Sequence, residues 1–284
     1  MYYAIGNRGA LISSYTKNKV PSNRTLTYKA GNFFKINQKE KNLLNNLEIS
    51  SANIINPLNN EKETWIGLLR KSKYDGIGIR EPIDICLLID ISISMGTKIK
   101  NSINNRLDIT KNAVMNFLKN INDKDNISVI KFNSKAEEII PFTNGKIFKA
   151  KFDKFIKNIY YLKDNGSTNL YRALHKAYNI MKKNAVNKYK RIIFITDITE
   201  MEYYEDKQFQ NLCFKISNKN IFITFLDISE QFNSKLFDQV SKMSGCNYYL
   251  IKKEKDFQKY LIDDFNYTCF VSAINTRIEF YLLI

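Results

Sequence analysis

From Pro82 onward the chain alternates apolar segments of strand length with amphipathic segments of helix length, and this alternation limits the possible folds most strongly. The run 83–89 (IDICLLI) is almost continuously apolar, which is typical of a strand covered on both faces. The run 191–196 (RIIFIT) has the same character. Repeated strand and helix units form parallel sheets whose right-handed crossovers place helices on both faces. The sequence therefore predicts an α/β fold with a doubly wound, mostly parallel, six-stranded sheet.

The expected elements follow one another in regular order along this part of the chain. We expect strands at 83–89, 127–132, 137–141, 191–196, 221–226 and 247–251, and helices at 107–118, 148–160, 170–181, 209–217, 234–243 and 256–265. In doubly wound sheets, ligands bind beyond the carboxyl ends of the strands. Because two of the apolar strands run directly into Asp90 and Asp197, both carboxylates are expected at that edge.

The flanking segments carry different signals. Residues 1–46 are rich in Asn, Lys and Ser with little periodicity, which predicts a poorly ordered extension. Segments 47–56 and 62–70 are typical of two short strands, so we assign 47–81 to accessory strands that precede the main domain at 82–267. Residues 268–284 alternate as one long or two short strands would. Since an unpaired apolar edge invites aggregation, we expect this segment to pair with the accessory strands in a small β-structure.

The net charge of +16 is compatible with a nucleic-acid or anionic-membrane partner. The lysines, however, are spread over nearly every segment, which indicates a bias of the whole composition and not one recognition patch. Nucleic-acid binding is therefore an alternative and not the favoured function. The first residues do not resemble a signal peptide, and no apolar run approaches the roughly 20 residues that span a bilayer. We expect a cytoplasmic or otherwise intracellular protein without a transmembrane segment.

Several enzymatic functions lack their residues. His175 is the single histidine, and its isolation excludes Ser-His-Asp catalysis and most zinc chemistries. The chain has neither a GxxxxGK[ST] loop nor a GxGxxG turn for phosphates. Asp90 as a phosphoryl acceptor would need an acid two residues later, where Ser92 stands. We therefore expect no enzymatic activity and assign no catalytic residue. A hydrolase that activates water with a metal ranks last, since no general base is evident.

Five side chains with oxygen donors form the candidate site. Asp90, Ser92 and Ser94 alternate in the loop after the first apolar strand, so their three side chains can point the same way. Thr168 lies just before a predicted helix, and Asp197 follows a second strand. Hard oxygen donors without His or Cys suit Mg²⁺ or Mn²⁺ better than Zn²⁺. With few carboxylates around it, the ion would keep much of its positive charge and would attract an external carboxylate.

The segment from Pro82 to about Tyr267, which contains these residues, resembles the von Willebrand factor A (vWA) domain, a Rossmann-like fold. The segment Asp90–Met95 looks like the DxSxS motif of the metal-ion-dependent adhesion site (MIDAS) of that family. The surrounding segments agree in order and spacing, namely Arg106–Asp108, Asp125–Phe132, Gly166–Leu170 and Ile195–Asp197.

The resemblance implies a role for each residue of the site. Ser92 and Ser94 would ligate the ion directly, Thr168 would be a direct or switching ligand, and Asp90 and Asp197 would mainly hold coordinated waters. An Asp or Glu of a protein partner would complete the coordination, which implies a metal-dependent protein-interaction module. Ile93 and Ile198 stand where family members often have Gly, and their bulk is expected to tighten the loops or weaken the metal site.

Overall fold

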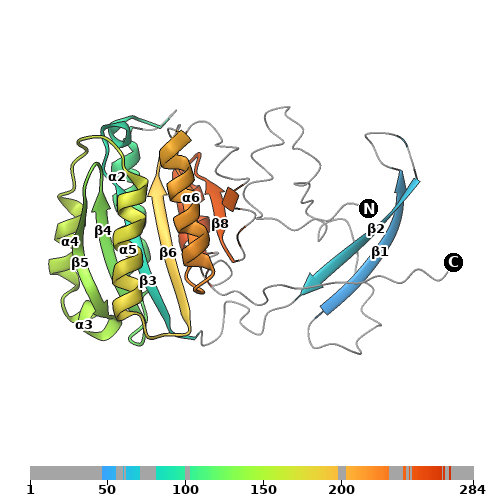
Figure 1. The fold of residues 1–284 in the computed structure, drawn as a ribbon, viewed down its shortest axis with the longest axis horizontal. Coiled ribbons are helices and arrows are strands. Elements are labelled where there is room, and N and C mark those ends of the chain that lie inside the picture. The colour runs from blue at the N-terminus through green and yellow to red at the C-terminus, as the bar shows by residue number, and fades with distance from the viewer. Residues whose placement is uncertain are drawn as a thin grey trace.

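A computed structural model of the chain describes residues 47–55, 60, 62–70, 81–99, 103–197, 203–229, 239–240, 243, 245–263, 265 and 269. Its main feature is a six-stranded sheet with the strand order β5-β4-β3-β6-β7-β8 (Figure 1). The strands are β3 (Ile83–Asp90), β4 (Asn126–Phe132), β5 (Ala136–Asn144), β6 (Tyr189–Thr196), β7 (Phe222–Asp227) and β8 (Asn247–Leu250). All neighbours are parallel except β4 and β5. The predicted α/β fold is confirmed.

Helices cover both faces of the sheet. They are α2 (Arg106–Leu118), α3 (Gly145–Ala150), α4 (Phe152–Tyr160), α5 (Leu170–Asn184), α6 (Tyr203–Ser217) and α8 (Glu254–Phe257), which continues as the π-helical segment η3 (Gln258–Asp263). Alternate residues of β3 point to opposite layers: Ile85 and Leu87 pack in the core with α2, α4 and α8, whereas Cys86 and Leu88 pack with α5 and α6. Burial on both faces explains why β3 is apolar throughout.

Several helix boundaries differ from the prediction: α6 begins at Tyr203 and not at 209, and α5 ends at Asn184 and not at 181. The expected single helix 148–160 is wrong, because α3 and α4 are separated at Lys151, whose backbone angles (φ −115°, ψ 19°) leave the helical region. The break places the buried Phe148 ring in a stacked contact with Phe155, at 5.6 Å between centroids. The expected helix 234–243 lies mostly outside the described residues.

The edge strand β5 is longer than expected and pairs irregularly with β4. Its register shifts on both sides of the pair formed by Val129 and Ile140, and the exposed Pro141 follows directly. Proline has no backbone N–H, so the strand tolerates it because this edge of the sheet has no further partner strand among the described residues.

The accessory strands β1 (Leu47–Ile55) and β2 (Lys62–Arg70) are present and form a separate antiparallel two-stranded sheet. The predicted extension 1–46 lies outside the described residues, and so does the predicted C-terminal strand segment apart from Cys269. Cys269 is buried in the core with α2, and its carbonyl accepts a hydrogen bond from Arg191. The pairing proposed for 268–284 therefore stays a prediction.

Candidate metal centre at the carboxyl edge of the sheet

The strand order reverses direction at the junction between β3 and β6. From β3 the chain adds β4 and β5 on one side, and β6, β7 and β8 on the other. β3 and β6 are parallel neighbours, with Ile89 opposite Ile195, so Asp90 and Asp197 follow at the same edge. Such a reversal opens a crevice beyond the carboxyl ends of the strands, where α/β proteins commonly bind ligands.

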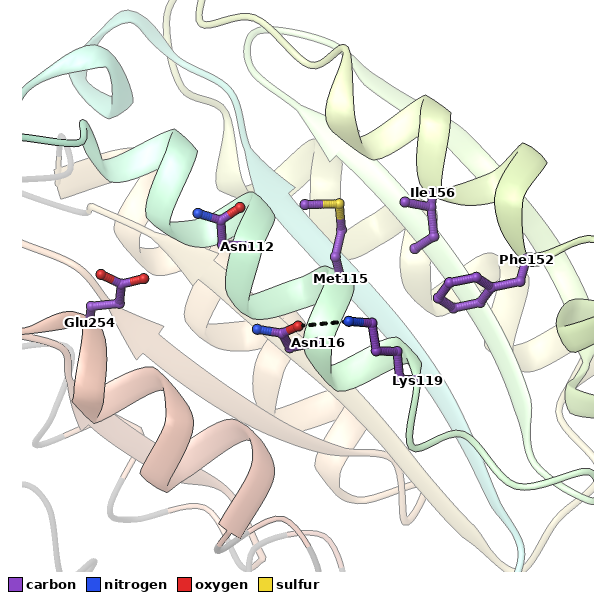
Figure 2. Close-up of a pocket in the computed structure, with 7 residues that line it drawn as sticks. All are labelled: Asn112, Met115, Asn116, Lys119, Phe152, Ile156 and Glu254. Atoms are coloured by element: carbon purple, nitrogen blue, oxygen red, sulfur yellow. Dashed lines mark hydrogen bonds between the residues drawn. The ribbon is translucent and has the colours of Figure 1, made fainter.

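A hollow in the described surface lies away from this edge. Figure 2 shows a pocket of about 330 Å³ on the outer side of α2, between α4 and the start of α8. Its lining mixes apolar, amide and charged side chains: Asn112, Met115, Asn116, Lys119, Phe152, Ile156 and Glu254. Lys119 donates a hydrogen bond to Asn116 within it. Because the pocket brings no set of carboxylates or hydroxyls together, the carboxyl edge is the better candidate for a cation site.

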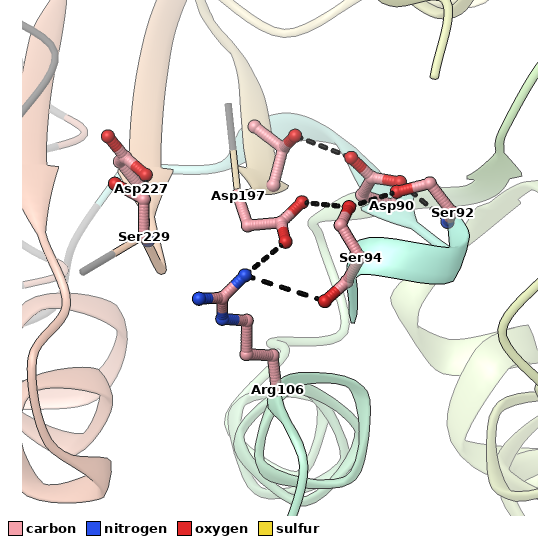
Figure 3. A network of polar contacts seen from close by, with 8 residues as sticks. Asp90, Ser92, Ser94, Arg106, Asp197, Asp227 and Ser229 are labelled. Atoms are coloured by element: carbon pink, nitrogen blue, oxygen red, sulfur yellow. Dashed lines mark hydrogen bonds and ion pairs between the residues drawn. The ribbon is translucent and has the colours of Figure 1, made fainter. Parts of the chain in front are cut away.

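Asp90 is fully buried and held on both carboxylate oxygens. Oδ1 accepts a hydrogen bond from the Ser92 backbone N–H at 2.8 Å, and Oδ2 accepts one from the Thr196 hydroxyl at 2.6 Å (Figure 3). Burial raises the pKa of Asp90 to about 6, against the opposing effect of these hydrogen bonds and with a smaller contribution from the nearby charge of Asp197. Asp90 thus has a fixed orientation at the bottom of the site.

Ser92, Ser94 and Asp197 form a continuous chain of side-chain oxygens. The Ser92 and Ser94 hydroxyls are 3.0 Å apart, and Ser94 donates to Asp197 Oδ1 at 2.8 Å. The local turn explains this convergence, since the chain passes from Ser92 into a short 3₁₀ helix, Ile93–Gly96. Ser94 is exposed while its two partners are buried, so the middle of the chain reaches the surface and both of its ends lie in the interior.

Ile93 fits this turn without strain. It lies in the 3₁₀ helix with a negative φ, and its side chain is 67% exposed. A glycine is therefore not required by the backbone at this position. Ile198, the other predicted departure from the family pattern, lies outside the described residues.

Arg106, the first residue of α2, also belongs to the site. Its Nη1 lies 2.5 Å from Asp197 Oδ2 and 3.4 Å from the Ser94 carbonyl oxygen, and the ion pair is almost fully buried. In the sequence, Arg106 is part of a motif that does not by itself predict this contact. One signal was available: a positive charge in the first turn opposes the helix dipole, so such a residue needs a nearby negative partner.

Thr168 does not join the network. The loop that carries it is tied to the DxSxS loop by two backbone hydrogen bonds, from Asn165 N–H to the Ile91 carbonyl at 2.7 Å and from Ile93 N–H to the Gly166 carbonyl at 3.0 Å. Thr168 itself is exposed and makes no hydrogen bond to the residues that the structure describes. The structure thus brings four of the five predicted residues into contact and leaves the fifth nearby in a tethered loop.

The donor set fits a hard divalent cation. Two hydroxyls and one carboxylate oxygen meet within hydrogen-bond distance, and a second carboxylate orients the loop from below. No group of three or more His, Cys, Asp or Glu side chains suited to a metal occurs in the described part of the chain. A cation here would therefore depend on the serine hydroxyls as much as on the carboxylates, which favours Mg²⁺ or Mn²⁺ over Zn²⁺.

A third acid at the same edge went unnoticed in the sequence. Asp227 ends β7 and begins Asp227-Ile228-Ser229, which repeats the tripeptide Asp90-Ile91-Ser92. Its Oδ1 accepts from the Ser229 N–H at 2.9 Å, as Asp90 does from Ser92, and its Oδ2 accepts from the Tyr248 hydroxyl. Figure 3 shows it on the strand end beyond Asp197. The repeated tripeptide was the available signal. Burial raises the pKa of Asp227 to about 6.

Asp227→Asn is expected to reduce the pH dependence of stability in the metal-free protein. The pKa of Asp227 is about 6 in the folded protein and about 3.9 in an unfolded chain. Folding is therefore favoured while the carboxyl is protonated, and this contribution is lost as pH rises from about 4 to about 7. Two pKa units correspond to roughly 3 kcal/mol. Urea unfolding in EDTA at pH 4.5 and 7 measures it, and an equal change with pH in wild type and variant would contradict the prediction.

His175, the single histidine, lies apart from the candidate site. It is exposed on the side of α5, where its ring stacks on Tyr171 and its Nδ1 contacts the Asn179 amide. It lies more than one helical turn after Leu170, the first residue of α5, and therefore away from the carboxyl edge of the sheet. It belongs to a helix surface and not to the oxygen network.

Comparison with known families agrees with this geometry. Residues 85–200, which include every residue of the predicted site, match the von Willebrand factor type A domain family. This part of the chain is thus similar to a vWA domain. A search of the curated proteins gave no match. Within the described residues, none of the helices is long and apolar enough to cross a bilayer.

Solved structures share the fold of the vWA domain at low sequence identity. The PilB minor pilin from Streptococcus sanguinis is 15% identical, with a TM-score of 0.54 over 78% of this chain and 77% of that one. A von Willebrand factor type A protein from Catenulispora acidiphila is 13% identical, with a TM-score of 0.55 over 72% of this chain and 45% of that one. The SpRpn10 VWA domain is 18% identical, with a TM-score of 0.51 over 64% of this chain and 95% of that one.

Proposed function

We propose that the vWA domain of this chain is a non-enzymatic protein-interaction module that binds Mg²⁺ and uses the ion to hold an Asp or Glu of a partner protein. Ser92 and Ser94 are the direct ligands, Thr168 joins them when its loop adjusts, and Asp90 and Asp197 hold coordinated waters. The observation that carries the proposal is the chain of oxygens from Ser92 through Ser94 to Asp197, with contacts of 3.0 and 2.8 Å.

The position of this chain of oxygens supports binding of an external group. Its middle member, Ser94, is exposed at the strand reversal between β3 and β6. An ion bound there supplies an open coordination position and a positive charge for a carboxylate. The chain's own residues fix the serine turn, orient the hydroxyls and leave the outer side open. No His, Lys or free carboxylate of the described network is placed to move a proton, which favours binding over hydrolysis.

Calorimetric titration of Mg²⁺ into the full chain at pH 7.5 tests the proposal. We expect one bound ion, and we expect Asp90→Asn to weaken its affinity about 10-fold to 100-fold, because second-layer carboxylates orient the ligands. Asp227→Asn is the matched control: it changes the same tripeptide at the end of β7, two strands away from β3 and outside the oxygen chain, and should reduce Mg²⁺ affinity much less than Asp90→Asn does. Failure of the wild type to bind Mg²⁺, or equal binding in wild type and Asp90→Asn, would refute the proposal.

A partner can be sought with the same control. A pull-down from a cell extract should retain a protein in Mg²⁺ and release it with a chelator, while Asp90→Asn should retain none. Replacement of the partner's contacting acid by its amide should then remove binding. Capture that persists in the chelator would assign the interaction to another surface.

Nucleic-acid binding is the second candidate, supported by the net charge of +16. Exposed lysines along α3 and α4, among them Lys146, Lys154 and Lys157, add to a basic surface. Affinity from phosphate contacts falls steeply with salt. Retention on heparin above moderate salt, unaffected by EDTA, would favour this function, and elution at low salt would dismiss it.

A further inference from the structure

The ion pair between Arg106 and Asp197 places a fixed positive charge inside the candidate metal site. Arg106 Nη1 contacts Asp197 Oδ2 at 2.5 Å, while Asp197 Oδ1 accepts from Ser94. Both oxygens of this carboxylate are therefore already occupied. A cation that takes up the serine hydroxyls must share Asp197 with the guanidinium.

The backbone around Arg106 keeps this charge in place. Its N–H donates to the Thr97 carbonyl at 3.0 Å, and Asn105 caps the helix by accepting from the Asp108 N–H at 2.7 Å. The Arg106 side chain is only 9% exposed, and its buried Nε has no hydrogen-bond partner among the described residues. The guanidinium is thus held toward the site through Nη1, at the cost of an unsatisfied donor.

We propose that Arg106 sets the charge balance of the metal site, so that the site holds its divalent cation less tightly but attracts the partner's carboxylate more strongly. This inference rests on the proposed function. Asp90 and Asp197 contribute two negative charges and Arg106 contributes one positive charge. With a divalent cation bound, the site therefore has one net positive charge. Without Arg106 the loaded site would be neutral. The same residue therefore repels the ion and favours the acid.

The two effects have opposite signs, which gives the inference a specific signature. Charges a few ångströms apart in a largely buried setting interact more strongly than in bulk water, so neutralising Arg106 should tighten cation binding by about 10-fold or more. It should also weaken carboxylate binding by the loaded protein by a similar factor. General damage to the fold would weaken both.

Mn²⁺ and acetate provide probes that need no partner protein. The full chain is titrated with Mn²⁺ by electron spin resonance of the free ion, and binding of acetate to the loaded protein is followed by paramagnetic broadening of its methyl proton signal. Arg106→Gln and Arg106→Met are the neutral variants, and Arg106→Lys retains the charge. Circular dichroism checks the folding of each.

We expect both neutral variants to bind Mn²⁺ at least 10-fold more tightly and acetate correspondingly more weakly, with Arg106→Lys close to the wild type. Unchanged or weaker Mn²⁺ binding in folded neutral variants would overturn the inference, and so would loss of folding in both, which would make Arg106 a structural residue. Absence of Mn²⁺ and Mg²⁺ binding in the wild type would instead refute the proposed function itself.

Discussion

Asp197→Ala should lower the free energy of unfolding of the metal-free protein by about 3–5 kcal/mol, because removal of one partner of a buried ion pair leaves the other charge without compensation. The charge left without a partner would be that of Arg106, whose Nη1 loses its 2.5 Å contact with Asp197. The remaining acceptor, the Ser94 carbonyl oxygen at 3.4 Å, is too distant to replace a carboxylate. Urea unfolding in EDTA measures the change.

The double variant Asp197→Ala/Arg106→Met distinguishes a stranded charge from a loss of packing. Replacing both members of a buried pair by apolar side chains is often neutral or stabilising. We therefore expect the double variant to recover most of the stability that Asp197→Ala loses. If the double variant is as unstable as the single one, the ion pair is not the cause.

Phe194→Ala should also lower the free energy of unfolding by about 3–5 kcal/mol, the usual cost of truncating a buried phenylalanine. Phe194 is fully buried in β6. Its ring stacks on Phe225 at 5.3 Å and meets Phe132 and Phe209 edge-on at 5.4 and 6.0 Å. Alanine would leave a cavity between three aromatic rings that the sheet and α6 hold apart.

Phe214→Ala is the matched control, since Phe214 lies on α6 and is 38% exposed. Its replacement should cost less than about 1 kcal/mol, because a partly exposed ring leaves no closed cavity. The two variants are compared by urea denaturation, with an unchanged slope expected for each. Equal destabilisation would contradict the assignment of Phe194 to the core.

The sequence predicted the sheet well because a strand that is buried on both faces has a continuous run of apolar residues. β3 had to be apolar at every position between two helical layers, and a strand of that kind ends visibly at a carboxylate such as Asp90. The break between α3 and α4 at Lys151 has no comparable signal in the sequence. It accompanies the stacking of Phe148 on Phe155, a contact that the continuous helical pattern of the sequence does not indicate.

The candidate site was predictable in chemistry and only partly in geometry. The residue types at 90, 92, 94 and 197 identify oxygen donors, and the edge position follows from the parallel sheet. The contact between Arg106 and Asp197 joins residues 91 positions apart, so no local pattern contains it. The placement of Thr168 depends on a loop that turns at Gly166 with φ +73°, and a turn of that kind is set by the contacts of the folded protein.

The irregular pairing of β5 has a consequence for how copies of this domain can meet. A sheet edge recruits a foreign strand through an unbroken row of backbone donors and acceptors. Here Pro141 removes one donor, the shifted register around Val129 bends the row, and Glu137 adds charge. Growth of the sheet from one molecule into the next is disfavoured at this side. Self-association of the concentrated domain is therefore expected at a surface other than the β5 edge.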